Sequence, residues 1–229
     1  MRNLWIALFL LILPRGNTAQ RILFVGNSLT ISRPAPDLGW GGLWGMAATQ
    51  PDRDYAHRVQ LMLTERQGAA PEIAIIGADL HRWQSASTEI ARAAQRLKPD
   101  LVIVQMGEHA TADTPYADFL AAYSQIAEWT PGARHIALGL WGGPSGDVRG
   151  INIERAAGET GMQYIAIRDL HIEENTATQY TNAAVAWHPN DQGMNFIAGR
   201  IVRGLQPVTW LPWITSSGNG TIPTGGTIP

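Results

Sequence analysis

The sequence alternates short apolar segments with amphipathic ones, and this alternation restricts the possible folds more than any other feature. Five of the apolar segments lack a strict two-residue period, which is typical of strands that are buried on both faces. These predicted strands are residues 21–27, 71–77, 101–107, 134–142 and 162–169. Such strands need helices on both sides of a sheet to exclude water.

The segments between the predicted strands supply those helices, since each has apolar residues at three- and four-residue spacing. Ser87 and the segment 113–115 are read as helix starts. Repeated strand-helix-strand units favour right-handed connections and a parallel sheet. We therefore predict an α/β, doubly wound, flavodoxin-like fold with a five-stranded parallel sheet and helices on both faces. The predicted helices are residues 55–68, 87–97, 116–129, 151–161 and 190–205.

The two ends of the chain differ from this body. Arg2 precedes an apolar run of only ten residues, 4–13, which is short for a segment that crosses a bilayer. Residues 1–19 therefore predict a cleavable signal peptide, with an uncleaved anchor as the alternative. Residues 214–229 are rich in Gly, Ser, Thr and Pro and predict a flexible tail. Residues 20–213 are left as one domain, expected to be secreted or periplasmic.

Composition and missing motifs exclude several classes of function. The net charge is −2 and no Lys/Arg-rich block occurs, so nothing indicates binding to nucleic acid or to an anionic membrane surface. The sequence has no cysteine and therefore no disulfide or thiolate nucleophile. Walker, dinucleotide and zinc-protease motifs are absent. We expect no cofactor, no metal, no nucleic-acid partner and no stable membrane association after the signal is removed.

Polar residues follow the predicted strands where ligands of open α/β sheets bind, at the carboxyl ends. Ser28 follows the first strand, Glu108 and His109 follow the third, and His188 precedes the last helix. A serine and a histidine in one crevice are the nucleophile and general base of acyl transfer. Each also has a plain structural alternative, because Ser28 can cap a turn and residues 188–191 can simply begin a helix.

Three segments resemble those of the SGNH (also called GDSL) hydrolase superfamily of esterases, lipases and deacetylases. FVGNSLT around Ser28 resembles the first family block, whose serine is the nucleophile, and WHPNDQGM around His188 resembles the fifth, whose histidine is the base. VIVQMGEHA resembles the third block, in which a strand ends in Gly-X-Asn-Asp. The resemblance implies an SGNH-type fold and a secreted serine ester hydrolase in which Ser28 and His188 are catalytic.

The oxyanion site departs from the family pattern. His109 and Ala110 stand where the third block has Asn and Asp. The resemblance makes His109 an oxyanion donor, although a metal ligand or a structural polar residue at the strand end is the alternative. Gly77 is, by elimination, the counterpart of the second-block glycine, and the amide of Ser28 is a further donor implied by the family.

The base histidine also lacks its usual partner. The family places an aspartate three residues before this histidine, and here that position is Val185. A Ser–His dyad is the minimal interpretation, unless Asp169, Glu108 or Asp191 orients the imidazole from elsewhere. The residues alone do not choose among these three.

Tryptophans in predicted loops near the carboxyl ends of the strands suggest a substrate class, because exposed aromatic faces stack on sugar rings. The substrate-binding candidates are Trp141 and Trp187, an acetylated carbohydrate is the simplest substrate, and a hydrophobic lid is the alternative. Two rival functions remain: a catalytically weakened SGNH-like module that binds glycans, and an anchored scaffold protein that keeps residues 1–19. The tryptophans in these loops are Trp40, Trp44, Trp83, Trp141 and Trp187.

Overall fold

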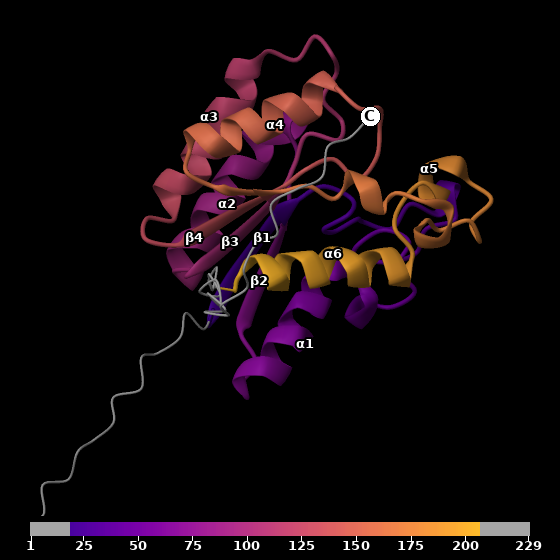
Figure 1. Cartoon of the computed structure of the whole chain (residues 1–229), viewed down its shortest axis with the longest axis horizontal. Helices are drawn as coiled ribbons and strands as arrows, with labels where there is room; N and C mark the ends of the chain where they lie inside the picture. Colours follow the sequence, from indigo (N-terminus) through magenta and orange to yellow (C-terminus); the bar gives the residue numbers. More distant parts are fainter. Residues whose placement is uncertain (1–18, 207–229) are drawn as a thin grey trace, which may run out of the picture.

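A computed structural model describes residues 19–206 and confirms the predicted fold. Its five strands form one parallel sheet in the order β2-β1-β3-β4-β5 (Figure 1). The predicted signal peptide, apart from its last residue, and the predicted tail lie outside the described residues. The strands are β1 (Arg21–Gly26), β2 (Glu72–Gly77), β3 (Leu101–Gln105), β4 (Arg134–Leu138) and β5 (Gln163–Ile165).

Helices cover both faces of the sheet, as the doubly wound prediction requires. α1 and α6 pack on one face, and α2, α3 and α4 pack on the other (Figure 1). The helices are α1 (Tyr55–Gln67), α2 (Trp83–Leu97), α3 (Tyr116–Trp129), α4 (Val148–Glu159), α5 (Ala183–Ala186) and α6 (Asp191–Gly204). Short 3-10 turns are Pro36–Leu38, Pro51–Arg53, Leu80–Arg82, Arg168–Leu170 and Glu173–Asn175.

The continuous apolar character of the strands follows from this double cover. In β1, Leu23 and Val25 pack toward α2, α3 and α4, whereas Ile22 and Phe24 pack toward α1 and α6. All four side chains are fully buried. Burying an aliphatic or aromatic side chain of this size contributes about 1.5–3 kcal/mol, so both faces of the strand favour the folded state.

Helix starts were predicted less well than the strands. Ser87 does not begin a helix, because α2 already starts at Trp83 and the Ser87 hydroxyl donates to the carbonyl of Gln84 inside it. Helix α4 likewise begins at Val148 behind an Asp147 cap, three residues before its predicted start. Helix α5 was not predicted, because four residues are too few to show a helical period.

The topological switch point of the sheet, where the strand order reverses, lies between β1 and β3. Ligands of open α/β sheets bind at such a point. The amide of Asn27, just after β1, donates to the carbonyl of Gln105 at the end of β3 (3.1 Å). The loops that carry Ser28 and His109 therefore start side by side.

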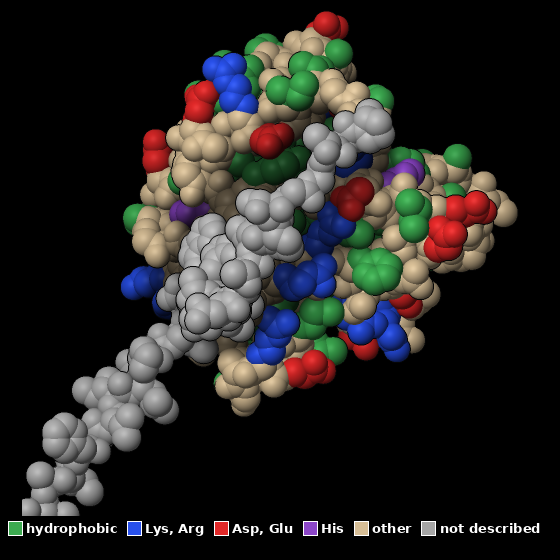
Figure 2. All heavy atoms as spheres, viewed as in Figure 1, with side chains coloured by type: hydrophobic (Ala, Val, Ile, Leu, Met, Phe, Trp, Pro, Cys, Tyr) green, Lys and Arg blue, Asp and Glu red, His purple; other side chains and the backbone are tan. Residues whose placement is uncertain are grey.

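The charged side chains of the described residues are mixed in sign on the visible face. On the face shown in Figure 2, acidic and basic side chains are interspersed over α1 and α6, in keeping with the near-neutral net charge. Among residues 19–206, no helix has the length and apolar character needed to cross a membrane.

Candidate active site

Ser28 lies in a tight turn directly after β1. The amides of Thr30 and Ile31 both donate to the carbonyl of Asn27 (2.9 Å each), and the Asn27 side chain accepts from the amide of Leu29 (3.1 Å). Only glycine fits at position 26, because an added Cβ would lie 2.1 Å from Thr30 Oγ1 and 2.6 Å from a backbone carbonyl. This turn leaves the Ser28 side chain partly exposed at the carboxyl edge of the sheet.

His188 reaches Ser28 from the far end of the chain. The two residues are 160 positions apart, yet Ser28 Oγ and His188 Nε2 are 2.8 Å from each other. His188 Nδ1 lies 2.7 Å from the carbonyl oxygen of Ala184. A carbonyl only accepts, so Nδ1 carries the proton and Nε2 presents its lone pair to the serine hydroxyl. This is the tautomer that a general base for serine requires.

The electrostatic surroundings keep His188 neutral. Its side chain is buried, and this burial, more than any other cause, lowers its pKa from 6.5 to about 4, with the nearby charge of His109 acting in the same direction. At neutral pH the imidazole is therefore unprotonated and able to accept the serine proton.

None of the three acids considered from the sequence bonds to His188. Asp169 pairs with Arg200, Asp191 accepts from the amide and hydroxyl of Thr49, and Glu108 accepts from the amide of Trp141 (2.6 Å). The partner of Nδ1 is instead the carbonyl of Ala184. Sequence reasoning missed this group because every residue has a carbonyl, and residue type gives no signal for it.

The surroundings of Val185 are unfavourable for the aspartate that the family has at this position. Its side chain is fully buried in a small apolar cluster. The other buried members of that cluster are Trp40, Met46, Ala47 and Ala177. A carboxylate at position 185 would lose its hydration among these groups.

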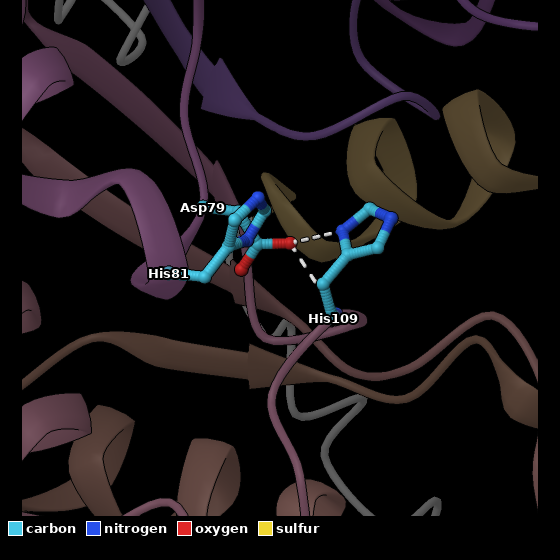
Figure 3. Close-up of side chains that lie close together, drawn as sticks. All are labelled: Asp79, His81 and His109. Carbon is cyan, nitrogen blue, oxygen red and sulfur yellow. Dashed lines mark hydrogen bonds and ion pairs between the residues drawn. The ribbon is translucent and has the colours of Figure 1, made fainter.

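His109 is held by an aspartate that the sequence analysis did not single out. His109 Nδ1 lies 2.7 Å from Asp79 Oδ2, and the ring nitrogen Nε2 points away from Asp79 (Figure 3). Asp79 is buried, whereas the side chain of His109 is 54% exposed. Sequence reasoning could have found Asp79, because a carboxylate two residues beyond the end of β2 lies at the same sheet edge as the residues after β3.

Two further groups were expected to donate to an oxyanion. The amide of Ser28 makes no hydrogen bond within residues 19–206, so it remains able to bind a substrate oxygen. Gly77 ends the edge strand β2. The amides of Glu72 and Ala78 donate to the carbonyls of Gln20 and Gly26, on the β1 side of the strand. Alternate amides of a strand point to opposite sides, so the Gly77 amide points away from β1. Its oxyanion role stays a prediction without support from this geometry.

Asp79, His81 and His109 come close enough to raise the question of a metal, with ligand atoms within 4.8 Å of one another (Figure 3). The Asp79 carboxylate already accepts from the amides of Leu80 and Gly107 and from the Asn27 side chain, in addition to His109. His109 Nδ1 would have to give up its hydrogen bond to Asp79 to bind an ion there. These contacts form a hydrogen-bonded carboxylate–imidazole pair.

The tryptophans are mostly packed into the protein. Trp141 is fully buried and its Nε1 donates to the carbonyl of Trp187 (2.8 Å), so the exposed stacking face predicted for Trp141 does not exist. Trp40 is buried as well. Trp187 is partly exposed and meets the His188 ring edge to face at 5.6 Å, so a substrate-binding role for Trp187 stays a prediction.

Glu108 belongs to the loop that carries His109 and directly precedes that histidine. Loss of hydration raises its pKa to about 7, although the Trp141 amide and the charge of Arg149 act in the opposite direction. Arg149 also donates to the Glu108 carbonyl (2.8 Å), which ties this loop to α4. Within residues 19–206 the Glu108 carboxylate therefore bonds to this region of the fold and makes no hydrogen bond to His188.

Comparisons with known proteins are informative at the level of structure. No protein-family model and no curated protein sequence matches the chain. Among solved structures, TesA is 18% identical over 82% of this chain and 99% of its own, with a TM-score of 0.59. Axe2, an acetylxylan esterase from Geobacillus stearothermophilus, is 15% identical over 81% of this chain and 94% of its own, with a TM-score of 0.53.

A two-domain esterase active on acetylated mannans is also similar, with 18% identity over 90% of this chain and 53% of its own, at a TM-score of 0.54. Identities this low establish the fold and not the activity. The parallel sheet order, the turn at Ser28 and these structural neighbours lead to one conclusion: this chain has the fold of the SGNH hydrolases, the superfamily that its sequence blocks resemble.

Proposed function

We propose that this protein is a serine ester hydrolase in which Ser28 is the nucleophile and His188 is the general base. The observation that carries the proposal is the 2.8 Å contact between Ser28 Oγ and His188 Nε2, with Nδ1 fixed by the Ala184 carbonyl. Ser28 Oγ attacks the ester carbonyl as His188 takes its proton, and His188 then protonates the leaving alcohol. Water releases the acyl group from Ser28 by the same two proton transfers.

A short-chain aryl ester tests this proposal. We expect the purified protein to hydrolyse it, Ser28→Ala to lose at least about 10³-fold in kcat, and a fluorophosphonate probe to label Ser28. Ser85→Ala is the matched control, because Ser85 is an exposed serine on α2 whose hydroxyl donates to the carbonyl of Arg82, just before that helix. Equal rates for the wild type and Ser28→Ala would refute the hydrolase and favour the glycan-binding module.

We further propose that the ester is on a carbohydrate. Two structural neighbours act on acetylated xylan and acetylated mannans, according to their descriptions. A cavity of about 310 Å³ lies at the carboxyl ends of β4 and β5, lined by the polar side chains of Asp147, Glu154, Tyr164 and Arg168 and by apolar Ile151. Hydroxyl-rich sugar rings suit such a mixed lining, and the volume is within the range of small-ligand sites.

The position of this cavity indicates an oligosaccharide and not a single sugar. β4 and β5 are two and three strands from β1, so the cavity lies roughly 10–14 Å from the strand that carries Ser28 at about 4.8 Å per strand. We expect Tyr164→Phe to lower kcat/KM several-fold on acetylated xylo-oligosaccharides and to leave it unchanged on the aryl ester. A matching loss on both substrates would contradict a role of this cavity in sugar binding.

We also propose that the protein is exported, on the basis of the apolar run near its N-terminus. The mass of the protein recovered outside the cytoplasm tests this directly. A mature chain that begins near Gln20 is the expected result. Retention of residues 1–19 would instead support the anchored alternative.

A further inference from the structure

The carboxylate of this site is beside a different histidine from the one expected. His188, the base, has a backbone carbonyl as its partner, and His109 has Asp79. We propose that Asp79 holds His109 as an imidazolium whose Nε2–H stabilises the oxyanion formed when Ser28 attacks the ester. This inference rests on the proposed hydrolase function and assigns Asp79 as a positioning residue.

Asp79 is built to remain ionised and fixed. Its Oδ1 accepts from the amides of Leu80 (2.7 Å) and Gly107 (2.9 Å). Its Oδ2 accepts from Asn27 Nδ2 (3.3 Å) and from the amide and Nδ1 of His109 (3.4 and 2.7 Å). Burial alone would raise the pKa of Asp79, but these hydrogen bonds outweigh it, so the pKa is lowered.

The donors to Asp79 come from the turns that form the site. Asn27 precedes the nucleophile, Leu80 follows β2, and Gly107 and His109 follow β3. One carboxylate therefore joins the Ser28 turn to the loop of His109. Because His109 Nδ1 must donate to Asp79, the ring orientation is set, and Nε2 is directed away from the carboxylate (Figure 3).

The charges around His109 favour its protonated form. The hydrogen bond to Asp79 is the main cause that raises the pKa of His109, and the charges of Asp79 and Glu108 add to it; partial burial and Arg82 act against it. The ring of His81 lies 5.2 Å away. The charge of His109 in turn lowers the pKa of His188, so the two imidazoles lie within electrostatic reach of each other.

The reaction step balances with these charges. The Ser28 Oγ–carbon bond forms, the serine proton moves to His188 Nε2, and the carbonyl π pair becomes the oxyanion. The Ser28 amide and His109 Nε2–H donate to that oxyanion, and His109 keeps its proton throughout. When the pair re-forms the carbonyl, the carbon–oxygen bond to the alcohol breaks and the alcohol takes the proton from His188.

A charged donor suits this chain better than a neutral amide would. Hydrogen bonds from an ionised donor are roughly twice as strong as those between neutral groups. The protonated His188 formed in this step has no carboxylate beside it. The negative charge of the oxyanion, which lies between the His188 and His109 imidazolium rings, offsets the repulsion between them. The Asn-to-His change in the third block and the missing aspartate in the fifth are then two parts of one arrangement.

The pH dependence of ester hydrolysis tests the proposal. We expect the kcat/KM of the wild type on an aryl acetate to fall on the acid side near pH 4, as His188 is protonated, and on the alkaline side above pH 6.5, as His109 loses its proton. His109→Ala should lower kcat by about 10²–10³ and remove the alkaline fall. His109→Asn, which supplies a neutral donor, should recover part of the rate without that fall.

Asp79→Asn tests the positioning residue itself, and it should move the alkaline fall to lower pH. Because Asn at a buried acceptor site can prevent folding, the titration of the His109 ring in the intact wild type, followed by NMR, gives a second readout. We expect its midpoint above 6.5. A midpoint below 6.5, or an alkaline fall that persists in His109→Asn, would overturn the proposal.

Control variants separate the Asp79–His109 pair from other causes of the pH dependence. His57 is paired with Asp54 at 2.9 Å on α1, so His57→Asn removes a similar pair and should keep the wild-type pH profile. His81→Asn and treatment with EDTA should also leave the profile unchanged, and loss of activity in either would favour a metal over the imidazolium. Wild-type activity that Ser28→Ala does not reduce would refute the hydrolase itself, whereas the ring titration reports on His109 alone.

Discussion

His188 and His109 both stand at the carboxyl edge of the sheet, but their surroundings give them opposite properties. His188 is buried and its Nδ1 donates to a neutral carbonyl, so loss of hydration dominates and its pKa falls. His109 is more than half exposed and its Nδ1 donates to ionised Asp79, so its pKa rises. A carboxylate beside one histidine and a neutral carbonyl beside the other thus go with opposite pKa shifts at the same edge of the sheet.

The largest effect is expected from removing the neutral member of this pair. His188→Ala should lower kcat on an aryl ester by at least about 10³-fold, because within residues 19–206 no other group is hydrogen-bonded to Ser28 Oγ. Steady-state kinetics at pH 7 measure this. His135→Gln serves as the control, since His135 lies on β4 and bonds to Thr130. A loss below tenfold in His188→Ala would mean that His188 is not the base.

A carboxylate beside His188 should reduce the difference in pKa between His188 and His109. Val185→Asp places an acid at the position that the family uses, within a buried apolar cluster. We expect the acid side of the pH profile to move up from about pH 4 and the free energy of unfolding to drop by about 2–4 kcal/mol. Val185→Asn is the neutral control and should destabilise without moving the profile. An unchanged acid limb in Val185→Asp would contradict this expectation.

The two histidines should affect stability with opposite signs. The folded pKa of His188, about 4, is below its unfolded value of 6.5, so the unfolded state binds more protons between these values and stability falls as pH drops from 6.5 to 4. The contribution is about 3 kcal/mol, at about 1.4 kcal/mol per pKa unit. His109 has a raised pKa, so its contribution is present below 6.5 and is lost as pH rises through its folded value.

Urea unfolding at several pH values separates the two contributions. The difference in unfolding free energy between the wild type and His188→Gln should shrink as pH falls toward 4. The difference between the wild type and His109→Gln should instead shrink as pH rises above 6.5. Two differences that change in the same direction with pH would show that the two histidines do not differ in charge as inferred.

The smallest effect is expected from Glu108. Its charge raises the pKa of His109 less than the hydrogen bond to Asp79 does. Glu108→Gln keeps an oxygen for the Trp141 amide and removes the charge, so the alkaline limb should shift down, and by less than in Asp79→Asn. The pH profile of kcat/KM measures this shift. An upward shift would contradict the assigned direction.

The local pattern of apolar residues was sufficient to predict most of the fold. All five strands occur where apolar runs predicted them, because strands buried on both faces leave a continuous signal along the chain. The start of α2 was missed because the Leu80–Arg82 turn leads directly into the helix, with Asp79 as the only side-chain cap. Boundaries of this kind depend on tertiary contacts that a local pattern does not contain.

The candidate site was predictable only in part. Ser28 and His188 belong to recognisable segments, and the structure brings Ser28 Oγ and His188 Nε2 to 2.8 Å from each other. The Ala184 carbonyl was not predictable, since a backbone group has no residue-type signature. Asp79 and Trp141 depend on long-range packing: one is paired across 30 residues, and the other is buried beneath Trp187.

The loop of residues 32–54 is hydrogen-bonded both to the turn of Ser28 and to the start of α6. The amide of Met46 donates to the Ser28 carbonyl (2.8 Å), while Thr49 binds Asp191 at the start of α6, three residues after His188. A change in the length of this loop would thus alter the distance between Ser28 and His188. A new loop grafted at this position would need to preserve the hydrogen bonds to the Ser28 carbonyl and to Asp191, or to replace them with other contacts to α6.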